Sequence, residues 1–146
     1  MEVGRNGYVI SDDPARLDLD LVWTFLRDSY WARNIPRDTV ARSIEGSLVA
    51  GLYTDGGDQV GFARAVTDRA TFAWIGDVFV LEEHRGGGLG AWLVETLLGH
   101  PDLDRLRLIV LATADAHGLY RRFGFEPIDA STFMSVRRPL DDLYGP

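Results

Sequence analysis

The residues best suited to chemistry in this chain lie in a glycine-rich stretch, EEHRGGGLGAWLV, at positions 82–94. Four of the five residues from Gly86 to Gly90 are glycines, and ordering that many glycines costs backbone entropy. The stretch follows an apolar run and opens a segment whose apolar residues recur at helical spacing. Free N–H groups at a helix N-terminus bind anions, and glycine lets a phosphate approach the backbone. The stretch therefore predicts a cradle for a phosphate or pyrophosphate.

Two common nucleotide-binding patterns fit this stretch poorly. A Walker A loop ends in Gly-Lys-Ser/Thr, whereas residues 90–92 are Gly-Ala-Trp and the chain contains no lysine. Residues 86–91 do match the dinucleotide-binding fingerprint G-x-G-x-x-A. That fingerprint needs an acidic residue at the end of the next strand, which here ends in Ala112-Thr113. A plain glycine-rich turn is a further alternative, although glycine this dense usually marks close backbone approach.

A third pattern fits better and has a second part. Arg85, Gly88 and Gly90 match Arg/Gln-x-x-Gly-x-Gly/Ala, and the segment GLYRRFGFEP at 118–127 follows after one expected helix and one expected strand. In both motifs, and in their order and spacing, the chain resembles the GNAT superfamily of N-acetyltransferases over roughly residues 70–127. The resemblance implies an α/β (α+β) fold with a mixed, mostly antiparallel sheet, splayed between strands 4 and 5 and flanked by about four helices. It also implies acetyl-CoA as co-substrate.

The resemblance assigns positions to the coenzyme. Its pantetheine arm would pair with the backbone of the strand WIGDVFVL, and its pyrophosphate would lie on the glycine-rich loop. A glycine within a strand often marks a bulge, so Gly76 is the candidate for the point where the sheet opens. The coenzyme-binding residues implied are Val78, Phe79, Val80, Arg85, Gly86, Gly87, Gly88, Leu89, Gly90 and Ala91.

The resemblance implies direct attack of an amine on the thioester in a ternary complex. Such a reaction benefits from an acid that protonates the leaving thiolate. Tyr120 matches the tyrosine of the family's C-terminal segment and is the candidate acid. The alternative is a tyrosine that merely packs in the core beside Phe123 and Phe125. A non-catalytic acyl-CoA-binding sensor or assembly module is the alternative function, and it would not need the chemistry of Tyr120.

Asp77 is the candidate base. An acid in so apolar a run should be buried and should have a partner or a raised pKa. Strand alternation places it on the same face as Ile75 and Phe79. A structural carboxylate paired with an arginine such as Arg64 is an equal alternative, and a water relay would also serve as the base.

The segment DSYWARNIP, residues 28–36, joins the first two expected helices, a region that covers the acceptor site in the resembled family. Tyr30 and Trp31 could stack on an acceptor or hold a cation over a ring, or else anchor the loop in the core. Trp74 and Arg64 are further candidates for contact with the acceptor.

Composition limits the other possibilities. A chain of 146 residues with 46% apolar residues is expected to form one domain, 1–146, with a packed core. The absence of cysteine excludes disulfides and thiol nucleophiles, and the three histidines lack metal-site spacing, so no metal is expected.

A net charge of −7 argues against nucleic acid as a partner. No apolar run approaches the roughly 18 residues of a membrane helix and no signal pattern is evident, so a cytoplasmic protein without a membrane partner is expected. The expected partner is a small-molecule or peptide amine, and a homodimer is an open alternative because relatives often form dimers.

The elements that must position these residues follow from periodicity and turn residues. A β-α-β crossover around the central helix favours one parallel strand pair, and the earlier neighbours are linked by a hairpin. In chain order we expect an edge strand at 8–10, helices near 21–26 and after Pro36, a hairpin over 47–68, a central strand at 70–81, a helix at 89–99, a strand at 104–113, a short helix closed by Gly124, and a last strand at 133–140.

Overall fold

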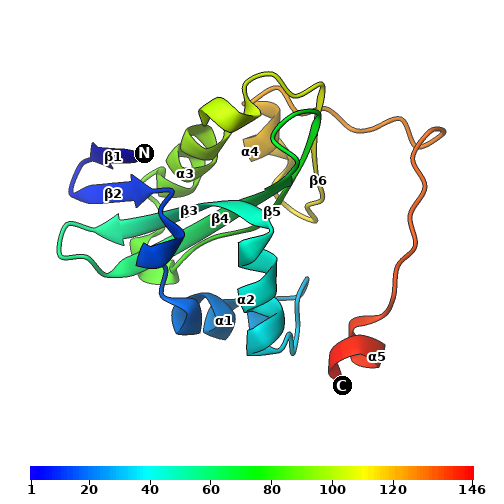
Figure 1. The fold of residues 1–146 in the computed structure, drawn as a ribbon, viewed down its shortest axis with the longest axis horizontal. Helices are drawn as coiled ribbons and strands as arrows, with labels where there is room; N and C mark the ends of the chain where they lie inside the picture. Colours follow the sequence, from blue (N-terminus) through cyan, green and yellow to red (C-terminus); the bar gives the residue numbers. More distant parts are fainter.

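A six-stranded sheet organises the chain in the computed structural model, which describes all of residues 1–146 (Figure 1). The strands lie side by side in chain order. The first five pair antiparallel, and the last pairs parallel with the fifth. The expected mixed, mostly antiparallel sheet is therefore confirmed. The strands are β1 (Glu2–Arg5), β2 (Tyr8–Ser11), β3 (Ser47–Thr54), β4 (Gln59–Thr67), β5 (Phe72–Val80) and β6 (Leu108–Leu111).

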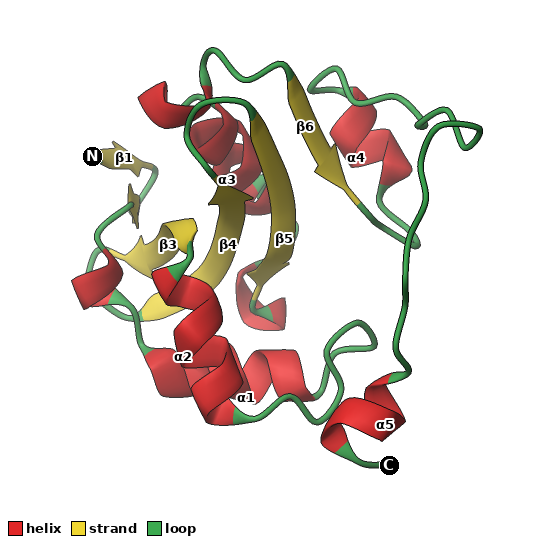
Figure 2. Cartoon of the chain, turned by 45° about the vertical axis from the view of Figure 1, so that its right-hand side comes forward, coloured by secondary structure: helices red, strands yellow, loops and turns green.

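Helices cover both faces of the sheet (Figure 2). There are five α-helices where about four were expected: α1 (Leu19–Arg27), α2 (Arg37–Glu45), α3 (Leu89–Leu98), α4 (His117–Arg121) and α5 (Leu140–Tyr144). The side chain of Asp18 caps α1 by accepting from the N–H of Leu21, and Pro36 precedes α2, where its missing N–H costs nothing. None of the helices combines the length and apolarity needed to cross a bilayer.

Two apolar clusters lie on opposite sides of the sheet. On one side α3 packs through Trp92, Leu93 and Leu97 against strand residues that include Ala73 and Ile75. On the other side the buried residues are Val22, Leu26, Ala32, Val40, Val49, Phe62 and Phe79. The second cluster packs α1 and α2 on the face opposite α3, beside the irregular part of β5 between Gly76 and Phe79.

A β-bulge in β5 positions the candidate base. Phe62 pairs with Phe79 and Arg64 pairs with Gly76, so the single residue between them on β4 faces two residues, Asp77 and Val78. Asp77 adopts φ = 55°, a left-handed conformation that aspartate tolerates better than most residues. The bulge occurs beside Gly76, as predicted, but the residue with positive φ is Asp77.

The bulge overturns the predicted alternation along this strand. Ile75 packs in the cluster beneath α3, whereas Phe79 packs in the cluster of α1 and α2. The two residues therefore lie on opposite faces, because the extra residue of a bulge shifts the period-2 pattern by one. The prediction that Ile75, Asp77 and Phe79 share a face was wrong for this reason.

The sheet opens between β5 and β6. The two strands pair over only four residues, from Phe72 with Leu108 to Ile75 with Leu111, while β5 continues to Val80. The predicted splay beside the central strand is confirmed. The opening lies between the fifth and sixth strands instead of the fourth and fifth, because an N-terminal strand, β1, was not expected. Asn6 and Gly7 both have positive φ and turn β1 into β2, so residues 8–11 form an interior strand instead of an edge.

The C-terminal part of the chain differs most from the prediction. Residues 133–140 were predicted to form the last strand, but residues 126–139 belong to no helix or strand and run along the outside of the domain before α5 (Figure 1). The prediction was wrong because a favourable strand sequence forms a strand only where it finds a partner backbone. The strand predicted at 104–113 is also shorter, since β6 spans only 108–111.

Candidate active site

The glycine-rich loop presents unpaired backbone donors at the start of α3. Gly86 and Gly88 have φ of 92° and 78°, and Gly88 is the N-cap residue of α3. None of the N–H groups of residues 86–91 donates a hydrogen bond within the chain. A Cβ added at Gly86, Gly87 or Gly88 would meet nothing within 4 Å, so this backbone faces open space. Six free donors at the positive end of a helix dipole match a phosphate or pyrophosphate.

The start of this loop is tied to the strands on either side. The Nε of Arg85 donates to the carbonyl oxygen of Val80 at 2.8 Å. The hydroxyl of Tyr8 on β2 lies 2.8 Å from Nδ1 of His84. A cavity of about 320 Å³ lies beside the loop, lined in part by Arg5, Asn6 and Gly87. Sequence reasoning missed Arg5 and Asn6, because only the pairing of β1 and β2 brings the N-terminal hairpin to the loop.

A second group of residues lies around the bulge in β5. The indole Nε1 of Trp31 donates to Oδ1 of Asp77 at 2.9 Å, and Nε of Arg64 donates to Oδ2 at 2.6 Å. Arg64 also donates from Nη1 to the hydroxyl of Ser47 at 3.0 Å. The side chains of Arg64 and Asp77 are 17% and 11% exposed. The structure thus contains the arginine–carboxylate pair that the sequence analysis gave as one alternative for Asp77. Both carboxylate oxygens of Asp77 accept hydrogen bonds.

Aromatic rings hold the loop of residues 28–36 over this pair. Phe25 of α1 stacks on Phe79 with ring centroids 3.9 Å apart and lies against Trp31. Tyr30 meets Trp31 edge-on at 5.1 Å. Tyr30 and Trp31 are nevertheless 62% and 38% exposed, so their free faces are available to a ligand. Neither ring is simply an anchor buried in the core.

The same loop reaches across the opening of the sheet. The hydroxyl of Tyr30 accepts a hydrogen bond from the N–H of Ala114, in the connection that follows β6 and leads to α4. The loop of residues 28–36 therefore bridges the opening between β5 and β6 where the chain leaves β6. The glycine-rich loop follows the end of β5.

Tyr120 is the buried aromatic of α4. It is 9% exposed and meets Phe125 edge-on at 5.9 Å. Its hydroxyl makes no hydrogen bond within the chain. Burial raises the pKa of Tyr120, and the nearby Tyr30 and Asp115 raise this pKa further. The phenol therefore stays protonated at neutral pH and can donate a proton.

The structure joins three of the four predicted acceptor-side residues to the candidate base and leaves the fourth apart. Tyr30, Trp31, Arg64 and Asp77 form one chain of contacts. Trp74 lies outside it, 40% exposed, with its indole nitrogen 3.2 Å from where a Cβ of Gly76 would stand. Sequence reasoning missed the contributions of Phe25 and Ser47, which carry no motif and act only through packing and pairing.

Comparison with known proteins identifies the family. The model of the acetyltransferase (GNAT) domain matches residues 46–127, which is more than half of the chain and includes both the glycine-rich loop and Tyr120. The chain belongs to the GNAT family of acetyltransferases. GNAT acetyltransferases use acetyl-CoA as co-substrate and act on amine acceptors, and this chain is accordingly an N-acetyltransferase.

Individual relatives agree with this GNAT assignment. A protein of Gibberella zeae named as an acetyltransferase, FG08082, is 33% identical over an alignment of 128 residues that covers 72% of each chain. TAP2 of Glycine max, also named as an acetyltransferase, is 33% identical, and the match covers 69% of this chain and 45% of TAP2. A crystal structure of a GNAT-family protein from Xanthomonas campestris pv. campestris is 45% identical, with a TM-score of 0.91 over 98% of this chain and all of that one.

Proposed function

We propose that this GNAT protein transfers the acetyl group of acetyl-CoA to an amine acceptor by direct attack in a ternary complex. The observation that carries the proposal is the run of six unpaired N–H groups at residues 86–91, beside a sheet that opens next to β5. Those donors would hold the pyrophosphate, with Arg85 anchoring the loop to Val80. The backbone of Val78, Phe79 and Val80 has no strand partner on the side of the opening, and it would hold the pantetheine arm. When bound, acetyl-CoA supplies the reactive thioester.

Tyr120 would act as the general acid. Its hydroxyl has no partner within the chain, and burial keeps the phenol protonated at neutral pH by raising its pKa. The hydroxyl could therefore donate a hydrogen bond to the thioester sulfur and pass its proton to the sulfur as the C–S bond breaks. This role separates an enzyme from a protein that only binds acyl-CoA, because binding alone needs no proton donor.

Asp77 would position the acceptor. Both of its oxygens are engaged, by Trp31 and by Arg64, so its lone pairs are less available to remove a proton. Its left-handed backbone is held by the bulge, which keeps the carboxylate fixed beneath Trp31. We propose that a water molecule removes the proton of the amine. Asp77 would hold Trp31 in a fixed orientation, and Trp31 would in turn position the acceptor.

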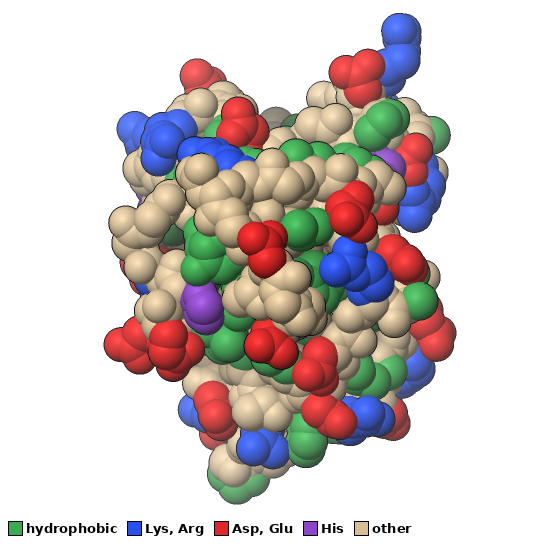
Figure 3. Space-filling view, turned by 90° about the vertical axis from the view of Figure 1, so that its left-hand side faces the viewer, with side chains coloured by type: hydrophobic (Ala, Val, Ile, Leu, Met, Phe, Trp, Pro, Cys, Tyr) green, Lys and Arg blue, Asp and Glu red, His purple; other side chains and the backbone are tan.

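The acceptor would be a small-molecule or peptide amine that contacts the exposed faces of Tyr30 and Trp31. Aromatic faces attract cations, and amines are protonated before they react. The chain carries a net charge of −7, and acidic side chains are spread over the face shown in Figure 3, which is the side of β1, β2 and the turn between β3 and β4. Such a surface favours the approach of cationic acceptors.

The proposal is tested by titration calorimetry with acetyl-CoA, followed by thiol release with a panel of amines and peptide N-termini. We expect saturable binding of acetyl-CoA and turnover with at least one amine. Binding without turnover on any acceptor would favour the acyl-CoA-binding module instead. Tight binding of NAD and none of acetyl-CoA would reject both.

A further inference from the structure

The C-terminal helix α5 is tied by hydrogen bonds to one segment of the domain, the loop of residues 28–36. Asp141 of α5 forms an ion pair with Arg33. The side-chain nitrogen Nδ2 of Asn34 donates to the carbonyl oxygens of the two residues that follow α5, at 3.1 and 2.9 Å. Apart from bonds within residues 139–146, this end of the chain makes no other hydrogen bond. We call the contacts of Arg33 and Asn34 with this end of the chain the α5 clamp.

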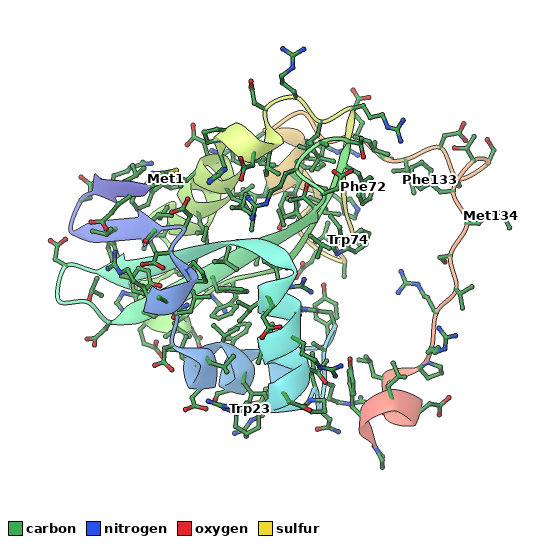
Figure 4. All side chains as sticks on the ribbon, in the orientation of Figure 1. Met1, Trp23, Phe72, Trp74, Phe133 and Met134 are labelled. Atoms are coloured by element: carbon green, nitrogen blue, oxygen red, sulfur yellow. The ribbon has the colours of Figure 1, made fainter.

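The docking of α5 is polar, because the helix brings no buried residue to the domain. Neither apolar cluster includes any of its residues, and Leu143 is 52% exposed. The arm that leads to α5, residues 126–139, is exposed along its whole length and belongs to no helix or strand. Figure 4 shows Phe133 and Met134 on the part of this arm that stands away from the domain. Hydrophobic burial therefore does not hold α5 in place, and the α5 clamp does.

Asn34 transmits the position of α5 to the backbone of the loop. Its φ of 63° is left-handed, a conformation that asparagine adopts more readily than most residues. Its N–H donates to the carbonyl oxygen of Arg27, the last residue of α1, at 2.9 Å. The same turn directs both hydrogens of Nδ2 to the residues that follow α5. One residue thus joins α1, the loop and the C-terminal segment.

The restrained loop carries the two aromatic side chains of the candidate acceptor site. Trp31, two residues before Arg33, donates to Asp77 of β5. The hydroxyl of Tyr30 accepts from the N–H of Ala114 at 3.4 Å, a long hydrogen bond. The α5 clamp adds a further anchor immediately after these two rings. A loop anchored on both sides of its contact residues loses less conformational entropy when a ligand binds.

We propose that the α5 clamp positions the acceptor: it holds Tyr30 and Trp31 in place before the amine arrives, so that binding does not have to order the loop. The inference rests on the proposed function for the identity of the acceptor. Arg33, Asn34 and Asp141 are positioning residues, since they act through the two rings.

The clamp should act on one substrate only. The glycine-rich loop is anchored separately, by the hydrogen bond of Arg85 to Val80, and makes no hydrogen bond to α5 or to the loop of residues 28–36. Loss of the α5 clamp should therefore raise the KM for the amine and leave kcat and the affinity for acetyl-CoA unchanged.

A charge swap tests the ionic half of the clamp. Asp141→Arg places two arginines together and Arg33→Asp places two aspartates together, whereas the double variant R33D/D141R restores an ion pair. We expect each single variant to raise the KM for the amine about fivefold, the upper range for an exposed ion pair. The double variant should return the KM to within about twofold of the wild type. Calorimetry should show the wild-type Kd for acetyl-CoA in all three variants.

Glu2→Arg is the matched control for the charge swap. It breaks the exposed ion pair of Glu2 with Arg16 and changes the net charge as much as Asp141→Arg does. Glu2 lies on β1, at the edge of the sheet farthest from β6, so the KM for the amine should not change. A wild-type KM in both single variants, an equal rise in Glu2→Arg and Asp141→Arg, or a double variant no better than the single variants would overturn the proposal.

Asn34 tests the hydrogen-bonded half of the clamp. Asn34→Gly keeps a residue that adopts positive φ and removes both bonds to the residues after α5. We expect a rise in the KM for the amine of roughly tenfold for two lost hydrogen bonds. Asn34→Asp keeps the size of the side chain but replaces the donor by an acceptor, so its KM should rise at least as much. A wild-type KM in Asn34→Asp would overturn the proposal.

Exchange of the Trp31 indole proton, followed by NMR without acetyl-CoA or amine, reports on the loop itself. Asp77 holds this N–H, so opening of the loop exposes it to solvent. We expect faster exchange in Asp141→Arg and Asn34→Gly than in the wild type and Glu2→Arg, and wild-type exchange in R33D/D141R. Unchanged exchange in the first two variants would overturn the clamp, even in an active acetyltransferase. Faster exchange in a protein that turns over no amine would support the clamp and reject the proposed function.

Discussion

Trp31 donates a hydrogen bond from its indole to Asp77 across 46 positions of sequence, at 2.9 Å. This bond joins the loop after α1 to the bulge in the central strand. It fixes an exposed aromatic ring above a carboxylate that Arg64 already neutralises. The bond explains why the candidate acceptor site forms where the sheet begins to open, because the bulge that turns Asp77 toward Trp31 lies at that point.

Removing the charge of Asp77 should loosen acceptor binding and reduce stability. Asparagine tolerates positive φ, so Asp77→Asn keeps the bulge but leaves the guanidinium of Arg64 without its counter-ion. A fully buried pair loses 3–5 kcal/mol when one partner is removed, and for this partly exposed pair we expect about 2 kcal/mol by urea unfolding. Asp20→Asn removes the exposed partner of Arg37 and should change stability little.

The kinetics of Asp77→Asn separate its two candidate roles. A positioning role predicts a higher KM for the amine, with the shape of the pH profile of kcat unchanged. If kcat instead falls by roughly 100-fold and the acidic limb of the profile disappears, Asp77 is the general base.

Replacing the phenol of Tyr120 should slow the reaction without weakening coenzyme binding. General acids contribute roughly 10²–10⁴-fold, so we expect Tyr120→Phe to lower kcat by about 10²-fold, measured by thiol release. Affinity for acetyl-CoA, measured by calorimetry, should be preserved. Tyr53→Phe removes the same atom from another buried tyrosine and serves as the control, with normal turnover expected. Unchanged turnover in Tyr120→Phe would remove the residue from the mechanism.

The raised pKa of Tyr120 also predicts the alkaline behaviour of the enzyme. The protonated form acts as the acid, so activity would be lost only as pH rises through a pKa above the ordinary value of 10.0. We therefore expect no falling limb in kcat below about pH 10. A limb below that pH that persists in Tyr120→Phe would belong to another group.

A bulky side chain in the glycine-rich loop should weaken coenzyme binding. Gly88→Val places a β-branched side chain at φ = 78°, which costs about 1–2 kcal/mol, and it also projects into the space facing the loop. We expect at least a tenfold loss of affinity for acetyl-CoA by calorimetry. Gly57→Val provides the matched control, since Gly57 also has positive φ (94°) and open space but lies in the turn between β3 and β4. Equal losses in both variants would point to general destabilisation.

Tyr53 should control part of the stability at high pH. Its hydroxyl is buried and has no hydrogen-bond partner, and burial raises the pKa of Tyr53 to about 12. Unfolding frees the phenol to ionise near 10, so the stability due to this group is present below pH 10 and is lost as pH rises toward 12. Two pKa units correspond to roughly 2.7 kcal/mol. Urea unfolding at pH 7 and pH 11 should show a smaller alkaline loss in Tyr53→Phe than in wild type, with Tyr144→Phe as control.

The glycine-rich loop could be predicted from sequence because its determinants are local. Glycines at Gly86 and Gly88, an apolar run before them and helical spacing after them suffice to specify a strand, a turn and a helix start. The segment that holds Tyr120, taken together with this loop, then indicated the GNAT family. The hairpin of β3 and β4 was confirmed for the same reason, since its turn residues lie between two strands that are adjacent in the chain.

The surroundings of Asp77 could not be predicted in the same way. Alternation placed it beside Ile75 and Phe79, but a bulge exists only relative to the register of β4, which lies outside the local pattern. The sequence offered Arg64 as a possible partner of Asp77, but it was one arginine among 15 that could have paired with it. Only the register of Arg64 with Gly76 made that pairing possible.

By itself, the sequence determined the family, the glycine-rich loop and most of the elements, because spacing of two to four residues and glycine chemistry act along the chain. Tertiary structure decided which way Asp77 points, what Trp31 covers, and that residues 133–138 remain unpaired within one chain. These outcomes depend on hydrogen bonds and contacts between strands and loops that are distant in sequence. The same residues 133–138 carry a strand pattern in the sequence, yet a strand needs a neighbouring edge, and the chain alone does not bring one to them.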